Sequence, residues 1–348
     1  MRVLLVSGPA RGGMLTWVRE AARVLSEASG SVAVAAPHTV AGVENLTSFR
    51  LAVGERLIPG AGLTEGLRLA ARAFGADLLH AHGLRAGFAA RRTGLPFVYT
   101  LHGFPPGGAR GALFRMGEGR VLRSARAVSA VSEELATYAL ATGGRRAQVI
   151  APLPPVPPHP LPIPDGETVL GTLARLSPEK GVDTLLTAFA HLAPRERGMR
   201  LVIGGEGPEG PRLEALASSL GVAGETSFLG WVGESEDFFR GVSLYIQPSL
   251  REGFGLAACE AVSAGRPVVV SDTGGLPSAA GDGPWARLVP PGDAEALARA
   301  IREILDEDLA ALGERAHAFA RRRADAGTFA ANLLAFYEGA LSDKKTGE

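Results

Sequence analysis

Short apolar runs alternate with longer amphipathic segments along this chain, and this alternation restricts the fold more than any other feature. In the first half we expect strands at residues 3–6, 32–36, 78–80, 97–101 and 127–130, and helices at residues 14–28, 64–74, 109–123 and 132–142. Strands separated by helices of this length form parallel sheets, because each crossover helix returns the chain to the same edge. The first half is therefore predicted to be an open α/β domain.

A proline-rich stretch at residues 152–164 interrupts the alternation, and proline at this density favours a stiff, extended connector. A second series follows it, with strands expected at residues 168–174, 200–204, 226–229, 244–247, 267–271 and 287–289 and helices at residues 182–191, 209–220, 254–264, 293–304 and 307–323. We predict one domain at residues 1–155, a second at 156–327, and a C-terminal segment at 328–348 whose helix returns to the first. Two such domains form a cleft at the carboxyl ends of their strands.

The bulk composition excludes several classes of protein. The 348 residues suffice for two cores, and a hydrophobic content of 46% is that of a globular chain. The single cysteine, Cys259, rules out an internal disulfide and a multi-cysteine metal site. The chain has no run of 18 apolar residues, and the apolar run at its N-terminus is too short for a secretory signal. We therefore expect a cytoplasmic protein.

The charge is divided unevenly between the two halves. Residues 1–155 hold 18 arginines and 9 acidic residues, whereas residues 156–348 hold 18 basic and 27 acidic residues, so their net charges are +9 and −9. A basic first half can bind an anionic partner, such as the inner membrane face or a phosphorylated acceptor; attraction between the two halves is an equal alternative. The segment at residues 109–126, with its arginines around Leu113 and Met116, fits peripheral membrane contact or a packed helix with exposed arginines. No nucleic acid is expected.

Two glutamates separated by a glycine turn form the most specific motif. Gly253 and Gly255 follow Glu252 and interrupt any helix there, so that a new helix can start near Leu256 and carry Glu260. In one continuous helix, residues eight apart would lie about 12 Å apart along the axis. With the turn between them, the two carboxylates can face one cleft, and the helix directs its free N–H groups at it. This layout fits a sugar, a diphosphate and a ribose held in that order.

Other candidate residues follow predicted strands. Arg175 and Lys180 lie where the first strand of the second domain gives way to a helix, and an arginine fork with a lysine point charge is suited to a diphosphate. The loop containing Gly205 permits close backbone approach to a nucleoside, and Trp231 and Val232 can flank its base.

In the first domain, the glycine loop that contains Gly12 and Gly13 lies between a strand and a helix, as in a ligand-binding turn, although an ordinary turn is equally compatible. His102 ends an apolar strand, where it can bond to a sugar hydroxyl or shuttle a proton. No histidine or acidic cluster with metal-ligand spacing is evident, and Asp306 and Asp308 are expected in a solvated helical turn.

Taken in order, these pieces resemble the retaining glycosyltransferases of family four (group 1 type), which include bacterial mannosyl- and glucosyltransferases and sucrose synthase-like enzymes. The matching segments span nearly the whole chain: Gly12-Gly13, residues 77–83, residues 99–103, residues 131–133, Arg175 to Gly181, residues 204–208, residues 228–232 and Glu252 to Glu260. The most specific part of this resemblance is the combination of the two glutamates with Arg175 and Lys180. The resemblance implies the GT-B fold, two facing Rossmann-like domains with a cleft between them and a C-terminal helix returning to the first.

The resemblance also implies roles for the residues. Arg175 and Lys180 would grip the diphosphate of a nucleotide-diphosphate sugar, and Glu252 would bind hydroxyls of its sugar. The remaining expected donor-site residues are Gly205 and Val232 at the nucleoside, Gly253, Phe254, Gly255 and Leu256 at the turn, Glu260 at the ribose, His102 at the sugar, and Gly12 and Gly13 beside the phosphates and acceptor. No metal or other cofactor would be required. The acceptor hydroxyl would belong to a glycan, a lipid or a small molecule.

Two other classes of function remain open from the sequence. A nucleotide-sugar epimerase or a sugar phosphorylase would keep the same fold with a different reaction, and donor turnover without an acceptor would favour the epimerase. A non-catalytic sugar-nucleotide-binding subunit would also keep the fold. The presence of Arg175, Lys180 and both glutamates favours the transferase, because loss of either cation would be typical of the non-catalytic subunit.

Overall fold

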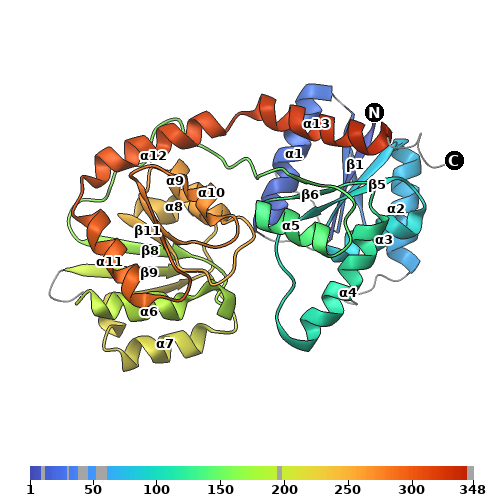
Figure 1. The fold of residues 1–348 in the computed structure, drawn as a ribbon. Helices are drawn as coiled ribbons and strands as arrows, with labels where there is room; N and C mark the ends of the chain where they lie inside the picture. Colours follow the sequence, from blue (N-terminus) through green and yellow to red (C-terminus); the bar gives the residue numbers. More distant parts are fainter. Residues whose placement is uncertain (9–11, 30, 38–45, 52–60, 194–197, 343–348) are drawn as a thin grey trace. The chain divides into compact units, whose positions relative to one another are not determined.

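The computed structural model describes residues 1–8, 12–29, 31–37, 46–51, 61–193 and 198–342. The chain divides into two compact units, unit 1 (Met1–Leu153 with Asp325–Glu348) and unit 2 (Pro154–Ala324). Each unit contains a parallel sheet with helices packed on it (Figure 1). The predicted fold class, α/β with two Rossmann-like domains, is confirmed.

Unit 1 contains a seven-stranded parallel sheet in the order β3-β2-β1-β4-β5-β6-β7 within the described residues. Its strands are β1 (Val3–Ser7), β2 (Val32–Ala36), β3 (Ser48–Arg50), β4 (Leu78–His82), β5 (Phe97–Leu101), β6 (Val128–Ala130) and β7 (Ala147–Val149). Its helices are α1 (Gly13–Ser29), α2 (Ala61–Phe74), α3 (Leu84–Thr93), α4 (Gly108–Ser124), α5 (Glu133–Ala141) and α13 (Ala326–Ser342). The central strands β1, β4 and β5 are buried throughout, which explains why they are predominantly apolar.

The C-terminal helix α13 belongs to unit 1, where it packs along α1 (Figure 1). Phe329, Leu333 and Phe336 are buried on its inner face. The hydroxyl of Tyr337 hydrogen-bonds Nδ1 of His80 on β4 at 2.8 Å. The final helix therefore completes the core of the first unit, as the sequence predicts.

The described residues of unit 2 form a six-stranded parallel sheet in the order β10-β9-β8-β11-β12-β13. Its strands are β8 (Thr168–Leu173), β9 (Met199–Gly204), β10 (Thr226–Gly230), β11 (Leu244–Gln247), β12 (Val268–Ser271) and β13 (Ala286–Val289). Its helices are α6 (Val182–His191), α7 (Gly210–Ser219), α8 (Ser235–Arg240), α9 (Leu256–Ser263), α10 (Leu276–Ala280), α11 (Ala294–Leu305) and α12 (Leu309–Arg323), with short 3₁₀ turns η1 (Pro178–Lys180) and η2 (Ala223–Glu225).

The strand order of each sheet reverses direction at one place. In unit 1 the chain builds outward from β1 in one direction and resumes at β4 on its other side; in unit 2 the same reversal separates β8 from β11. At such a switch point the two loops leaving the carboxyl ends of the strands diverge and open a crevice, where open α/β sheets bind ligands. The loops that follow β8 and β11 therefore flank the expected ligand-binding crevice of unit 2.

The proline-rich connector runs into unit 2 in an extended form and is fixed there by backbone and arginine contacts. The N–H of Leu161 donates to the carbonyl of Ala264 at 2.9 Å. Nη2 of the fully buried Arg266 donates to the carbonyls of Leu161 and Pro162, each at 2.7 Å. The connector lacks regular structure, as its proline content predicts, because it has few backbone donors to form a ladder.

Several elements differ from the sequence prediction. The helix α3 was not predicted, because its residues Leu84, Ala86, Phe88 and Ala89 are buried and leave little amphipathic alternation. The strands β3 and β7 and the helices α8 and α10 are too short to give a periodic signal. The helix predicted at residues 254–264 begins at Leu256, because Gly255 adopts a left-handed conformation with φ of 91°.

Among the described residues, no helix combines the length and apolarity needed to span a bilayer.

Among the described residues of unit 1, the acidic side chain of Glu118 on α4 is buried. Its two carboxyl oxygens accept hydrogen bonds from the hydroxyls of Tyr99, at 3.3 Å, and Tyr138, at 2.9 Å. Burial raises the pKa of Glu118 to about 7, and the two hydrogen bonds oppose this rise only in part. The folded unit therefore holds a proton on this carboxyl under conditions where the unfolded chain releases it.

We predict that Glu118→Gln makes unit 1 more stable than the wild type at pH 8, and that the difference shrinks toward pH 5. The pKa of Glu118 is higher in the folded protein than in the unfolded chain. Its contribution to the free energy of unfolding therefore falls, by up to about 3 kcal/mol, as the pH rises from the unfolded pKa to the folded pKa. Urea unfolding followed by circular dichroism across this pH range measures the gap. The exposed Glu65→Gln is the control. A gap that does not change with pH would contradict the prediction.

Candidate functional site

An ion pair joins the loops that follow β8 and β11. Nζ of Lys180, in η1, lies 2.6 Å from Oε2 of Glu252. The two side chains retain 19% and 12% of their exposure, so the pair lies close to the surface but is largely desolvated. The structure therefore brings together two residues that are 72 positions apart in the sequence, at the switch point of the sheet of unit 2.

The backbone around Lys180 is fixed by its contacts with the loop after β11. Gly181 has φ of 62°, and a Cβ added there would lie 2.1 Å from the carbonyl oxygen of Pro248. The N–H of Leu250 donates to the carbonyl of Glu179 at 2.9 Å. Only glycine fits at position 181, and the close approach of its backbone to Pro248 fixes the backbone of the neighbouring Lys180 against the loop after β11.

Polar residues that the sequence analysis did not select hold the carboxylate of Glu252. Nε2 of Gln247, the last residue of β11, donates to Oε2 of Glu252 at 2.6 Å, and Oγ of Ser249 donates to the same oxygen at 3.2 Å. The hydroxyl of Tyr245 in turn donates to Oε1 of Gln247 at 3.1 Å. In the sequence, these roles are indicated by two polar residues, Gln247 and Ser249, at the end of a buried strand. Together these donors fix the orientation of the carboxylate.

The glycine turn that follows Glu252 packs tightly against the loop after β12. The N–H of Gly253 donates to Oε1 of Glu252 at 3.0 Å. A Cβ at Gly255 would meet Cδ2 of Leu276 at 2.4 Å, and one at Gly274 would meet the carbonyl oxygen of Glu252 at 1.8 Å. Phe254 is buried at the centre of the turn. Close packing between the two loops leaves little freedom in the backbone that presents Glu252.

Helix α9 begins immediately after the turn, with Leu256 as its first residue, and its N-terminus has no side-chain cap. Free N–H groups at a helix N-terminus attract an anion. Glu260 lies on the same helix and is half-buried. Burial raises the pKa of Tyr245; its bond to the Leu173 carbonyl opposes this rise, and the nearby charges of Glu252 and Glu260 add to it. Both carboxylates therefore lie within electrostatic range of one tyrosine.

Arg175 lies at the same edge of the sheet but does not contact Glu252 directly. Its Nη2 lies 2.5 Å from Oε1 of Glu179, and its side chain keeps 67% of its exposure. Burial acts to raise the pKa of Glu179, but hydrogen bonds and the charges of Arg175 and Lys180 outweigh it and hold this pKa below its usual value. The two cations predicted for a diphosphate therefore each pair with an acidic side chain, and Arg175 is open to solvent.

Two more predicted residues lie beside this edge of unit 2. Gly205, which follows β9, has φ of 116° and donates its N–H to the carbonyl of Gly230 at 2.7 Å. Val232 packs on the next loop, where its Cγ2 would lie 2.9 Å from a Cβ added at Gly204. Trp231 keeps 65% of its exposure and presents an aromatic surface to solvent. This corner provides backbone groups and an exposed ring, as binding a base requires.

In unit 1 the predicted residues follow β1 and β5. Gly12 has φ of 65° and accepts hydrogen bonds from the first turn of α1, which begins at Gly13. His102, just after β5, is half-buried. Its Nε2 lies 2.9 Å from Nδ1 of His82, the last residue of β4 and fully buried.

The three neighbouring histidines of unit 1 are neutral at ordinary pH. Burial lowers the pKa of His80 to about 3, with a smaller contribution from His102, and burial lowers the pKa of His102 to about 3. Burial and both neighbouring histidines lower the pKa of His82 well below its usual value. His102 therefore suits a hydrogen-bonding role and does not suit a proton shuttle at neutral pH.

No group of three or more His, Cys, Asp or Glu side chains within the described ranges has an arrangement that could hold a metal ion. The aspartates at 306 and 308 act at helix ends: Asp308 caps α12 by accepting from the N–H groups of Ala310 and Ala311, each at 3.0 Å, and Asp306 ends α11. The two aspartates thus lie at the junction of two helices, whereas the sequence predicted a turn within one helix.

Solved structures share this architecture. The chain aligns with the Anabaena Alr3699/HepE protein, solved in complex with UDP-glucose, at a TM-score of 0.78 and 21% identity, covering 96% of this chain and 99% of that one. A likeness at this identity identifies the fold, which is the GT-B fold predicted from the sequence.

Two family models match nearly consecutive parts of the chain. Residues 12–155 match the "Glycosyl transferase 4-like domain", and residues 158–323 match "Glycosyl transferases group 1". The chain belongs to the group 1 family of glycosyltransferases, as the sequence motifs predict.

Among curated relatives, a D-inositol 3-phosphate glycosyltransferase of Streptomyces avermitilis is 38% identical over 164 residues, covering 43% of this chain and 34% of the relative. A 2-deoxystreptamine glucosyltransferase of Streptomyces kanamyceticus is 28% identical over 288 residues, 73% of this chain and 74% of the relative. The match to the first relative spans about a third of that protein's length.

Proposed function

We propose that this protein is a retaining glycosyltransferase that moves a sugar from a nucleotide-diphosphate sugar to an acceptor hydroxyl. The observation that carries the proposal is the pairing of Lys180 with Glu252 at the switch point of unit 2, beside the N-terminus of α9. This arrangement combines a cation for phosphate, a carboxylate for sugar hydroxyls and free backbone N–H groups within one small region. Family membership and the UDP-glucose complex of the Anabaena protein support the same chemistry.

In this proposal each residue has a distinct task. Lys180 exchanges Glu252 for the diphosphate when the donor binds, and Arg175 exchanges Glu179 for it in the same way. Glu252, released from Lys180 and still oriented by Gln247 and Ser249, accepts hydrogen bonds from the sugar hydroxyls.

The other proposed contacts lie on neighbouring segments. Glu260 binds the ribose, and backbone groups at Gly253, Phe254, Gly255 and Leu256 meet the phosphates and sugar. Gly205 and Val232 border the nucleoside. From unit 1, His102 contacts the sugar, and Gly12 and Gly13 border the acceptor and phosphates, as the family resemblance implies.

Departure of the nucleotide requires that its developing negative charge be stabilised. Lys180, Arg175 and the N-terminus of α9 supply positive charge and oriented dipoles for this purpose, so we propose transfer without a metal ion. The presence of both cations and of Glu252 favours transfer over a non-catalytic binding subunit. An epimerase or phosphorylase of this fold remains the alternative, and turnover of the donor in the absence of an acceptor would favour the epimerase.

We predict that a nucleoside diphosphate raises the melting temperature of the wild-type protein, and that chelator does not alter the shift. A panel of UDP, GDP, ADP and their sugar derivatives identifies the base.

Lys180→Met should remove most of the nucleotide-induced shift in melting temperature and most of the sugar transfer without altering the fold, because the diphosphate loses its lysine. Arg200→Met is the control, since Arg200 lies at the amino end of β9, at the opposite edge of the sheet. Normal binding by folded Lys180→Met would refute the assignment.

Retention of the anomeric configuration has its own test. Transfer from an α-linked donor to an acceptor hydroxyl should give an α-linked product, because a retaining enzyme adds the nucleophile on the face that the leaving phosphate occupied. The coupling constant of the anomeric proton in the NMR spectrum of the product distinguishes the two linkages. A β-linked product would show inversion instead.

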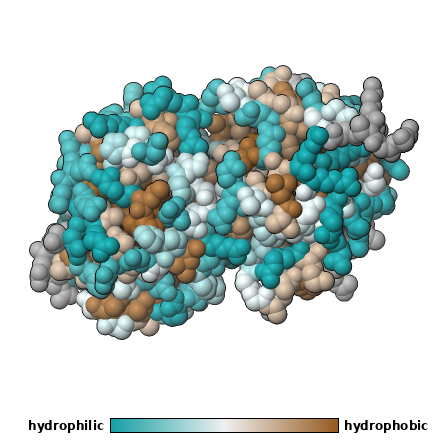
Figure 2. All heavy atoms as spheres, in the orientation of Figure 1, coloured by the Kyte–Doolittle hydropathy of each residue, from teal (hydrophilic) through white to brown (hydrophobic). Residues whose placement is uncertain are grey.

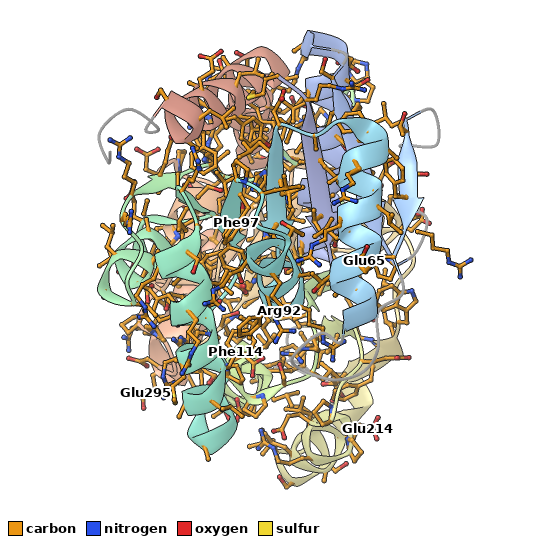
Figure 3. All side chains as sticks on the ribbon, turned by 90° about the vertical axis from the view of Figure 1, so that its right-hand side faces the viewer. Glu65, Arg92, Phe97, Phe114, Glu214 and Glu295 are labelled. Carbon is orange, nitrogen blue, oxygen red and sulfur yellow. The ribbon has the colours of Figure 1, made fainter. Side chains whose placement is uncertain are left out.

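We further propose that unit 1 makes peripheral contact with an anionic membrane through α4, so that a lipid-linked acceptor can be used. Leu113 and Met116 are exposed by 60% and 57%, and Arg120 and Arg123 are exposed along the same helix. The only acidic residue of α4, Glu118, is buried. Figure 2 shows tan, moderately apolar atoms beside hydrophilic teal ones at the lower end of this unit, and Figure 3 shows Phe114 on α4. A cytoplasmic location is proposed with this contact.

The membrane contact predicts co-sedimentation with vesicles of phosphatidylglycerol and weak co-sedimentation with phosphatidylcholine. The double variant Leu113→Asp and Met116→Asp should reduce binding by about tenfold or more, because two apolar anchors are lost and two like charges face the surface. Leu69→Asp is the matched control, since Leu69 is exposed by 57% on α2 of the same unit. Equal binding by the double variant and the control would overturn the proposal.

A further inference from the structure

A pair of histidines in unit 1 defines which nitrogen of His102 carries a proton. His82 and His102 share a hydrogen bond of 2.9 Å between Nδ1 of His82 and Nε2 of His102. Both rings are neutral, since burial lowers both pKa values far below neutrality. Each ring therefore carries a single N–H, and only one of these two N–H groups donates the hydrogen bond between the rings.

The other nitrogen of His82 distinguishes the two arrangements. Nε2 of His82 is buried and has no hydrogen-bond partner in the described part of the chain. If His102 donated the shared bond, His82 would carry its own proton on Nε2, and a buried N–H would remain unpaired. If His82 donates, only a lone pair remains unpaired. Orphaned buried N–H groups are rarer than under-used acceptors.

We infer that His82 is a positioning residue that donates Nδ1–H to Nε2 of His102 and so fixes His102 as the Nδ1–H tautomer. The side chain of His102 is half-buried, and within the described residues its Nδ1 has no protein partner. The group that His102 offers to a ligand is then a hydrogen-bond donor that cannot accept a proton. A ligand oxygen must accept from it, as the oxygen of a sugar hydroxyl does.

The surroundings hold His82 in the required orientation. Its ring packs against Trp17, with centroids 4.9 Å apart, and against His80, with centroids 4.2 Å apart. The indole N–H of Trp17 donates to the carbonyl of Ile150 at 3.3 Å, and His80 is bonded at both ring nitrogens, by Tyr337 and Thr100. His82 therefore has fixed neighbours on two sides, and its Nδ1 faces His102.

Two variants of nearly equal shape test this inference. In His82→Asn the amide nitrogen can occupy the place of Nδ1 and still donate to His102, whereas His82→Leu fills similar space without a donor. NMR of protein labelled with ¹⁵N-histidine reports the tautomer of His102 directly, and the signals lost in His102→Asn identify it. We expect the Nδ1–H form in the wild type and in His82→Asn, and an increased Nε2–H population in His82→Leu. An Nε2–H form in the wild type, or an unchanged tautomer in His82→Leu, would overturn the inference.

A second measurement connects the tautomer to ligand binding and rests on the proposed function. His82→Leu should weaken binding of the nucleotide-diphosphate sugar by roughly tenfold, because one oriented donor is lost, and should leave the nucleoside diphosphate unaffected. His82→Asn should restore most of the affinity. Equal weakening of both ligands would overturn the positioning role. Failure of the wild type to bind any nucleotide would refute the proposed function, while the NMR result would still decide the tautomer.

Discussion

The carboxylate of Glu252 accepts hydrogen bonds from a lysine, a glutamine, a serine and a backbone N–H, and the other features of the candidate site depend on this concentration of donors. A desolvated carboxylate requires such partners. In the proposed mechanism, hydroxyls of the donor sugar replace Lys180 at this carboxylate, while Gln247 and Ser249 keep the carboxylate in place. The released lysine would then pair with the diphosphate.

The fold brings these partners together through the order of strands. Lys180 follows β8 and Glu252 follows β11, and these two strands are neighbours only because the sheet reverses direction between them. Gly181 allows the loop after β8 to contact the loop after β11, and Gly255 and Gly274 allow the loop after β11 to contact the segment after β12, because a Cβ at each position would collide with a neighbour. Unit 1 contains a corresponding reversal between β1 and β4, and its histidines lie on β4 and just after β5. Each unit therefore places its polar residues where its sheet can bind a ligand.

The sequence predicts those parts of this arrangement that rest on backbone chemistry. Glycines on both sides of Phe254 indicate a turn before a helix, and the structure contains that turn with α9 beginning at Leu256. Most buried strands appear as predominantly apolar runs, so their positions are predicted within about two residues. Short elements, and the helix α3, whose residues are mostly buried, are not predictable, because periodicity requires length and an exposed face.

Partners that approach across the sheet could not be found from local patterns. Gln247 and Ser249 resemble the end of an ordinary strand until β8 is placed beside β11. His82 follows a predicted strand in a segment that resembles the family, but its partner could not be predicted, because its role rests on a hydrogen bond to His102, twenty positions away. Polar side chains at the carboxyl ends of buried parallel strands are the signal that would have identified Gln247 and Ser249.

Calorimetric titration of wild type and Glu252→Gln with a nucleoside diphosphate and with its sugar derivative tests the central claim most directly. If Glu252 binds the sugar and occupies Lys180 only in the absence of ligand, the variant should bind the nucleoside diphosphate as well as the wild type or better. The additional affinity that the sugar provides should be lost. Equal loss of affinity for both ligands would contradict this account, because Glu252 would then be required for the diphosphate subsite itself.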